Sequence, residues 1–399
     1  MKMRRKRLAR RGFWLILLLL PVLVLYLACS ARPVKVGAVL PLTGPMSSFG
    51  LSMQNAMKVA QRQVNDGGGI SGRPLEILYK DSGGLPGRAS DSARQLVEKE
   101  GIFVLIGADT SADVLAMVPL TRDGRCLLLS PSASTPKLTG AGDYVFRNWP
   151  SDTLEAKVMA DFAAYTLHAT RLLAVSQKGE YGDGLFMAFA GRFSGDRRRV
   201  SKMSFEPGAE PSAILARRIK MQMNKAQVLY LIGYPHSIVP LVRALREAGV
   251  DQPILSVSSL AGSPEVETLG AEGRGLLFPR PEWNPDSSSS GVSRFVSDYK
   301  KRFKKTPDVY AAHAYDAVRI LARVMSAGRM RPARIREGLL DLGDYAGVSG
   351  KTTFDKQGDV SQPFQVCVVW NGRVAPLSSV RQNVLPQLQH LVDALRFGS

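Results

Sequence analysis

Cysteine and histidine are scarce in this 399-residue chain, which contains three cysteines and four histidines. The histidines are scattered and lack the short spacings of metal ligands, so we predict no metal site. No G-x-S-x-G motif supports a serine nucleophile, and no P-loop sequence is present. The glycine run at residues 67–72 lies between a predicted helix and a strand, where glycines serve turns. We therefore predict no enzyme activity, no catalytic residue and no cofactor.

Acidic residues are fewer than basic ones. The chain has 34 Asp and Glu and 53 Lys and Arg, which gives a net charge of +19. Seven of the positive charges fall within the first eleven residues, and the others are scattered through the chain. No basic stripe interleaved with aromatic residues is present, so we interpret the remaining charge as solvated surface. The sequence predicts no nucleic-acid partner.

Charged residues are absent from positions 12–28, directly after the basic N-terminus. A basic start, an apolar run and small residues before Cys29 are typical of an export signal. We predict a signal at residues 1–28 and lipidation of Cys29, although Tyr26 and Leu27 depart from the usual lipoprotein pattern. A plain cleaved signal and an uncleaved anchor are the alternatives. The protein is expected in the periplasm or on an extracytoplasmic membrane face.

The two other cysteines, Cys126 and Cys367, occur in apolar runs that read as separate buried strands. Two buried thiols are the favoured interpretation. A disulfide remains the alternative, because the predicted compartment permits one.

Short apolar runs alternate with segments of helical periodicity from Val34 onward. The pattern restarts near residue 152, so two successive α/β units account for the chain to about residue 280. Short connections between strands and helices indicate parallel, doubly wound sheets. Three further helical segments and two terminal strands follow.

Ligands of doubly wound sheets bind beyond the carboxyl ends of the strands, and hydroxyl groups recur there in this sequence. Ser111 stands at a predicted helix start and Ser134 follows another strand. Each could be a simple cap or turn residue, but together they indicate an anion site suited to a carboxylate. Tyr181 and Tyr234 follow strands of the second unit. They could cover the surface or form a wall of a ligand cleft.

Several motifs together resemble the leucine/isoleucine/valine-binding protein family of ABC importers. They occur in family order and include "KVGAVLPLTGPMSSFG", "LIGADTSAD", "LLLSPSASTPKLT", "YVFRNWPSDTLEA", "GEYGDG" and "FDKQGDV". The resemblance implies the type I periplasmic binding fold, in which two lobes joined by crossing hinge strands close on a ligand. Lobe 1 would comprise residues 34–149 and 280–362, and lobe 2 would comprise residues 150–279 and 363–399.

The resemblance also implies roles for individual residues. Ser111 and Ser134 would hold a ligand carboxylate, with backbone groups around Ala133 assisting, and Asp152 would be a hinge residue. The loop after the first strand would place Phe49 at the cleft. The implied aromatic positions of the cleft are Phe49, Tyr181, Tyr234 and Tyr310.

At one position this sequence departs from the pattern of the family that it resembles. The acidic partner of a ligand ammonium would fall at Ser258, and no Asp or Glu is near it in the sequence. A buried ammonium without a countercharge is costly. Either Asp109 takes over this role, or the ligand is a carboxylate without an amine, or an amide.

These features lead us to expect an extracytoplasmic substrate-binding protein of an ABC importer. Its partners would be an amino acid or similar small molecule, a membrane permease and, through Cys29, the membrane itself. A ligand-sensing receptor and a cell-envelope interaction lipoprotein with the same fold remain alternatives.

Overall fold

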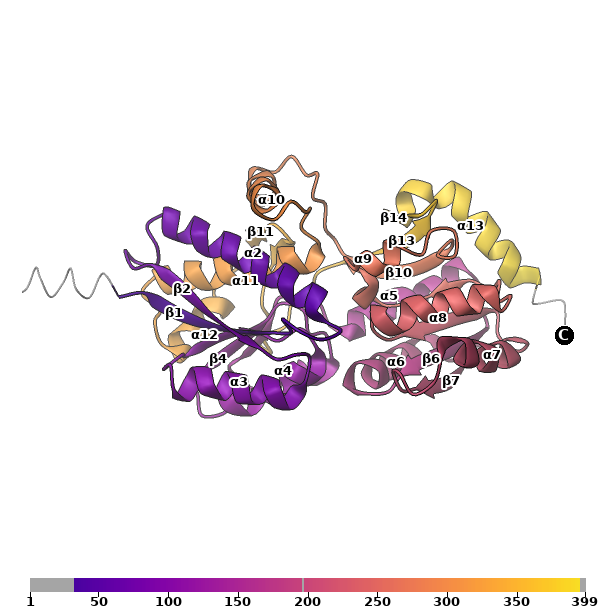
Figure 1. Ribbon diagram of the computed structural model, residues 1–399, viewed down its shortest axis with the longest axis horizontal. Helices are drawn as coiled ribbons and strands as arrows, with labels where there is room; N and C mark the ends of the chain where they lie inside the picture. The colour runs from indigo at the N-terminus through magenta and orange to yellow at the C-terminus, as the bar shows by residue number, and fades with distance from the viewer. Residues whose placement is uncertain (1–31, 196, 395–399) are drawn as a thin grey trace, which may run out of the picture.

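The computed structural model describes residues 32–195 and 197–394. These residues form two lobes that lie side by side along the long axis of the molecule (Figure 1). Each lobe contains one large β-sheet with helices on both faces. The predicted α/β architecture of two doubly wound lobes is thus confirmed. The predicted signal at residues 1–28 and Cys29 lie outside the described residues.

The first sheet has five parallel strands in the order β2-β1-β3-β4-β5. Six of the seven residues of β1 are buried, because its side chains enter apolar clusters on both faces of the sheet. The strands are β1 (Val34–Leu40), β2 (Leu75–Asp81), β3 (Val104–Gly107), β4 (Leu127–Ser130) and β5 (Val145–Arg147).

Helices from distant parts of the chain complete this lobe. On one face, α2 (Ser47–Asp66) packs against α11 (Val309–Ser326), and on the other lie α3 (Pro86–Glu98) and α4 (Ser111–Met117) (Figure 1). The remaining elements of the lobe are η1 (Val118–Thr121), η2 (Pro136–Leu138), α10 (Ser290–Phe303), α12 (Pro332–Leu340) and the hairpin of β11 (Tyr345–Gly347) and β12 (Gly350–Thr352).

The second sheet has the order β14-β13-β10-β9-β8-β6-β7. The strands from β10 to β7 in this order are parallel, whereas β13 and β14 are antiparallel additions at one edge. The strands are β6 (Arg171–Gln177), β7 (Arg199–Phe205), β8 (Val228–Ile232), β9 (Ile254–Leu255), β10 (Leu276–Pro281), β13 (Phe364–Trp370) and β14 (Arg373–Pro376).

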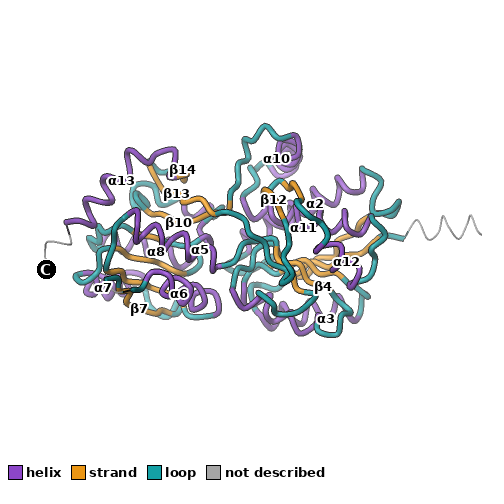
Figure 2. Tube along the Cα trace, turned by 180° about the vertical axis from the view of Figure 1, so that it is seen from behind, coloured by secondary structure: helices purple, strands orange, loops and turns teal. Residues whose placement is uncertain are grey.

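The helices of the second lobe include α5, which continues into a π-helical turn, and α13, which packs on β13 and β14 (Figure 2). They are α5 (Asp152–Asp161), η3 (Phe162–Thr166), α6 (Glu180–Phe193), α7 (Ser212–Met223), α8 (Pro235–Glu247), η4 (Ser258–Leu260), α9 (Pro264–Glu267) and α13 (Leu377–Ala394).

The chain passes between the lobes in three places, after β5, after β10 and before β13. The fully buried Arg147 joins two of these passages through a bidentate ion pair with Asp359, with Nε–Oδ1 at 2.7 Å and Nη2–Oδ2 at 2.8 Å. Its Nη1 also donates to the carbonyl oxygens of Ser134 and Thr135, both at 2.8 Å. The loop after β4 is therefore fixed to the crossing segments.

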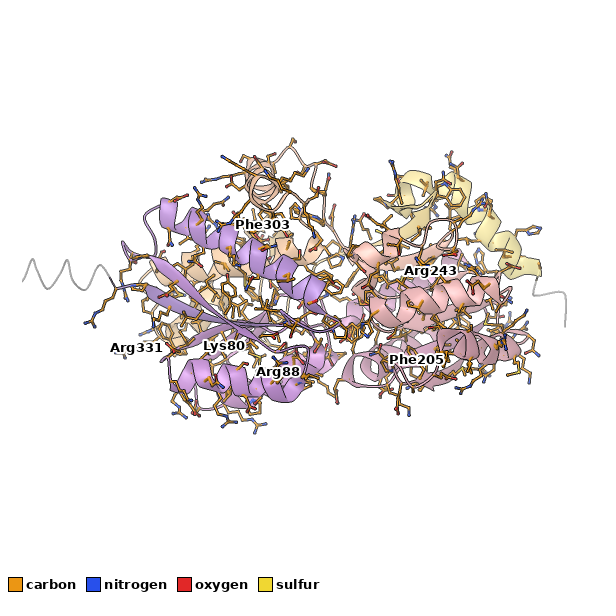
Figure 3. All side chains as sticks on the ribbon, in the orientation of Figure 1. Lys80, Arg88, Phe205, Arg243, Phe303 and Arg331 are labelled. Carbon is orange, nitrogen blue, oxygen red and sulfur yellow. The ribbon has the colours of Figure 1, made fainter. Side chains whose placement is uncertain are left out.

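Cys126 and Cys367 are both buried and unbonded, which confirms the interpretation of two buried thiols. Basic side chains are spread over both lobes, as the labelled Arg88 and Arg243 illustrate (Figure 3). Within residues 32–195 and 197–394, no helix is long and apolar enough to cross a membrane. The same residues contain no group of three or more His, Cys, Asp and Glu that could hold a metal ion.

Candidate ligand pocket between the lobes

A pocket with an empty volume of about 350 Å³ lies where the two lobes meet. The first lobe and its crossing segment supply Met46, Phe49, Asp109, Ser111, Ser132, Ser134, Trp149 and Tyr310. The second lobe supplies Tyr181, Tyr234, Ser258 and Ser259.

Eight of the nine residues that the sequence predicts for the site line this pocket, and Ala133 does not. The amide of Ala133 already donates to Ser130 Oγ at 3.1 Å, so it is not available to a ligand. Contact of the eight lining residues with a ligand stays a prediction.

Three aromatic rings form one wall of the pocket. The Phe49 ring meets Tyr310 edge to face at 4.8 Å, and Tyr310 stacks on Trp149 at 4.7 Å. The expectation of a loop at Phe49 is wrong, because α2 already begins at Ser47 and Phe49 lies in its first turn. Trp149 was not predicted as a site residue, although it lies within the motif "FRNWPSD" that marks the first crossing.

Ser111 has a hydroxyl proton available to the pocket. Its Oγ accepts a hydrogen bond from the Thr135 amide at 3.2 Å, so the hydroxyl hydrogen remains free to donate. Ser111 is the first residue of α4, but the residue that caps this helix is Thr110, whose Oγ1 accepts from the Asp113 amide. The cap interpretation of Ser111 is therefore wrong.

Tyr181 and Tyr234 stack on each other at 5.0 Å and form the facing wall. Tyr181 is the second residue of α6 rather than part of a loop, and Tyr234 immediately precedes α8. The buried Tyr181 hydroxyl has no hydrogen-bond partner within the described chain. Burial raises the pKa of Tyr181 well above its usual value, so the hydroxyl is protonated and can donate to a ligand.

Asp109 brings a carboxylate to the pocket. Only 7% of its surface is exposed, and its Oδ2 has no hydrogen-bond partner among the described residues. Burial raises the pKa of Asp109 to about 7, and the nearby charge of Asp113 adds to the increase. No Lys, Arg or His lines the pocket, so Asp109 has no cation beside it there.

The structure brings an acidic residue to Ser258, although none is near it in the sequence. Glu155 of α5 is fully buried, and its Oε1 accepts from the Ser258 amide at 2.8 Å. Its Oε2 forms a short hydrogen bond with Ser258 Oγ. The two residues are 103 positions apart, and they meet only because α5 packs beside the strand ends of the second sheet. No local pattern in the sequence indicates such a contact.

Asp152 lies one turn before Glu155 and is also fully buried. Neither of its carboxylate oxygens has a hydrogen-bond partner in the described chain, whereas its amide donates to the Ser134 carbonyl at 2.8 Å. Burial raises the pKa of both Asp152 and Glu155, and the charge of Asp152 further raises that of Glu155. Asp152 is the first residue after the crossing, and its hinge role stays a prediction.

Two doubly wound lobes, three connecting passages and a pocket between the lobes define a two-lobed ligand-binding protein. Residues 33–373 match the family described as periplasmic binding protein, so the chain belongs to that family.

Curated and solved relatives agree with this assignment. The chain is 26% identical over 357 residues to Leu/Ile/Val-binding protein homolog 3 of Brucella melitensis, which covers 88% of this chain and 95% of the relative. It is 26% identical to a leucine binding protein of Thermotoga maritima, with a TM-score of 0.80 and coverage of 86% and 97%. A solute binding protein of R. palustris in complex with benzoate has a TM-score of 0.76 at 21% identity, with coverage of 86% and 95%, and shows the fold alone.

Proposed function

We propose that this protein is the extracytoplasmic substrate-binding protein of an ABC importer and that it binds a small amino acid between its lobes. The names of the relatives support this class of ligand. A ligand in the pocket gains contacts from both lobes only when they are together, so binding shifts the population towards the closed form. A membrane permease would recognise that form, and lipidation at Cys29 would keep the protein at the membrane.

The observation that carries the choice of ligand is the charge of the pocket. Asp109 lines it with an unpartnered oxygen, and Glu155 and Asp152 lie buried behind it, without any lining cation. A buried carboxylate that lacks a partner is costly, and a ligand ammonium would offset that cost. The Ser111 and Ser134 hydroxyls would bind the carboxylate of the same amino acid.

An aromatic carboxylate is the second candidate ligand, because five aromatic rings line the pocket. They are Phe49, Trp149, Tyr181, Tyr234 and Tyr310. Such a ligand would bring an anion close to Asp109 without a compensating cation, so the electrostatics favour the amino acid.

Thermal shift and calorimetry with amino acids, their deaminated analogues and benzoate test the proposal. We expect an aliphatic amino acid to stabilise the protein by about 2.7 kcal/mol at a concentration 100-fold above its Kd. Ser111→Ala should weaken that binding about 10-fold, because a hydrogen bond to a charged group is lost. Ser379→Ala is the matched control, since Ser379 lies in the first turn of α13 and does not line the pocket.

Stabilisation by benzoate but by no amino acid would favour the second candidate. A protein that none of these compounds stabilises would contradict both ligand assignments.

A further inference from the structure

The serine hydroxyls around the pocket differ in the direction in which they can donate. Ser259 Oγ donates to the Gly233 carbonyl at 2.6 Å, and Ser132 Oγ donates to the Asp109 carbonyl at 3.0 Å. These two hydroxyls therefore present only lone pairs to a ligand. Ser111 is the opposite case, because its Oγ already accepts a hydrogen bond and its proton is free.

We propose that Glu155, which does not line the pocket, selects an amine-bearing ligand by holding the Ser258 hydroxyl as a hydrogen-bond acceptor. This inference rests on the proposed function and names a positioning residue for it. Because Glu155 Oε1 is occupied by the Ser258 amide, the Ser258 hydroxyl hydrogen points to Oε2 when Glu155 is ionised. The remaining lone pairs of Ser258 Oγ then accept N–H groups from the ligand, and the negative charge behind them favours an ammonium.

Protonation of Glu155 reverses the direction of its hydrogen bond with the Ser258 hydroxyl. A proton on Oε2 would be donated to Ser258 Oγ, and the Ser258 hydroxyl would then donate into the pocket and repel an ammonium. Burial and the charge of Asp152 raise the pKa of Glu155. A ligand ammonium lowers it again, so binding releases a proton and the affinity for the amine increases with pH. The other titratable or charged groups around this carboxylate pair are Arg147, Tyr181, Tyr230, Tyr234 and Tyr310.

A related carboxylate–serine contact occurs elsewhere in the protein and provides a control, although both of its hydrogen bonds share one carboxylate oxygen, Asp316 Oδ2. Asp316 of α11 is fully buried and accepts from the Ser349 amide at 2.7 Å and from Ser349 Oγ at 2.6 Å. Neither Asp316 nor Ser349 lines the pocket. A purely structural role for Glu155 would make Glu155→Gln and Asp316→Asn equivalent in their effect on binding.

The test is calorimetry of wild type, Glu155→Gln, Ser258→Ala and Asp316→Asn between pH 5.5 and 8.5. The probes are leucine, or whichever amino acid binds more tightly, and its analogue with hydrogen in place of the amine. A glutamine at position 155 donates its NH₂ to Ser258 Oγ and so reverses the hydroxyl. We expect Glu155→Gln to weaken binding of the amino acid about 10- to 100-fold and to leave binding of the deaminated analogue nearly unchanged.

The pH profile provides the second measurement. In wild type the affinity for the amino acid should rise with pH, and in Glu155→Gln the rise should be smaller, because only the titration of Asp109 then remains. Ser258→Ala should also lose the preference for the amine, and Asp316→Asn should keep it. Equal amino-acid affinity in wild type and in both site variants would overturn the inference but leave the proposed function standing. A wild type that binds no amino acid would contradict the proposed function itself, and the inference with it.

Discussion

Individual polar groups, rather than the fold, distinguish the chemistry of this pocket. The first lobe offers the free proton of Ser111, and the second offers lone pairs of Ser258 and Ser259. An α-amino acid carries one acceptor group and one donor group, so it can satisfy both lobes at once. Asp109 adds a buried negative charge, which destabilises the protein less when a ligand ammonium is bound.

The loss of folding stability caused by the buried Asp109 carboxylate can be measured without a ligand. Because its pKa is raised from 3.8 to about 7, the folded protein binds more protons than the unfolded chain between these values, and stability falls as the pH rises through them. Asp109→Asn removes this loss. We expect the variant to have a higher Tm than wild type at pH 8, with a smaller difference at pH 4.

The same variant should bind the amino acid less tightly, since it lacks the negative charge. Calorimetry at pH 8 measures this effect. A variant that is more stable and binds equally well would show that Asp109 does not face the ammonium.

Half of the predicted lining residues could be inferred from their positions after strands, namely Ser111, Ser134, Tyr181 and Tyr234, whereas the others depended on the resemblance to the family. Ser132 and Ser259 were missed although each lies within two residues of a predicted serine, since the sequence does not show which hydroxyl of a loop faces the pocket. Glu155 could not be predicted, because its role depends on packing between α5 and a loop 103 residues away.

The helices and strands, like the site residues, were only partly predictable from the sequence. Buried parallel strands were predictable from their continuous apolar runs, whereas β7, "RVSKMSF", was missed because it lies at a sheet edge and is largely exposed. Helices α7 and α13 were also missed. The first turn of α2 was interpreted as the loop that carries Phe49, because the residues from Ser47 to Gly50 have the composition of a turn.

The position of α2 depends on Gly50. A Cβ added there would lie 2.0 Å from the Pro41 carbonyl oxygen, so Gly50→Ala must push the start of α2 and Phe49 away from β1. We expect a loss of at least about 1 kcal/mol in the free energy of unfolding. Gly191→Ala in α6 is the control, because a Cβ there meets nothing within 4 Å.

Gly191→Ala should raise stability by about 0.5–1 kcal/mol, as expected for an exposed helical glycine. Chemical denaturation of both variants measures the contrast. Equal stability of the two variants would show that α2 does not approach Pro41 this closely.

At the scale of the whole molecule, the two lobes are in contact through the pocket residues. The Tyr310 hydroxyl donates to the Ser258 carbonyl at 3.2 Å and so joins the first lobe to the second. The exposed Lys137–Glu180 ion pair also spans the lobes, but such pairs contribute little. These contacts hold the lobes together, and under the proposed function they would have to separate to admit a ligand.

Small-angle scattering can follow this opening. We expect the radius of gyration of wild type to decrease when a saturating amino acid is added, because the ligand favours the closed form. Tyr310→Phe keeps the ring stack with Trp149 but loses the hydrogen bond between the lobes, so it should weaken binding about 3- to 10-fold. No change in radius upon binding would contradict hinge closure.

The hydrogen bonds of Arg147 bear on the order in which a ligand would contact the two lobes. Arg147 holds Asp359 and the carbonyl groups of Ser134 and Thr135, all on the side of the first lobe, and Ser111 is bonded to Thr135. This half of the pocket is therefore assembled before any ligand arrives. Under the proposed function, a ligand carboxylate would bind to this half of the pocket while the cleft is open. Under the proposed function, the amine would meet Asp109 on this lobe first, and Ser258 with Glu155 only when the second lobe closes. A deaminated analogue would lack the contacts of both lobes with the amine, so its closed complex would be shorter-lived than that of the amino acid and would dissociate before a transporter could accept it.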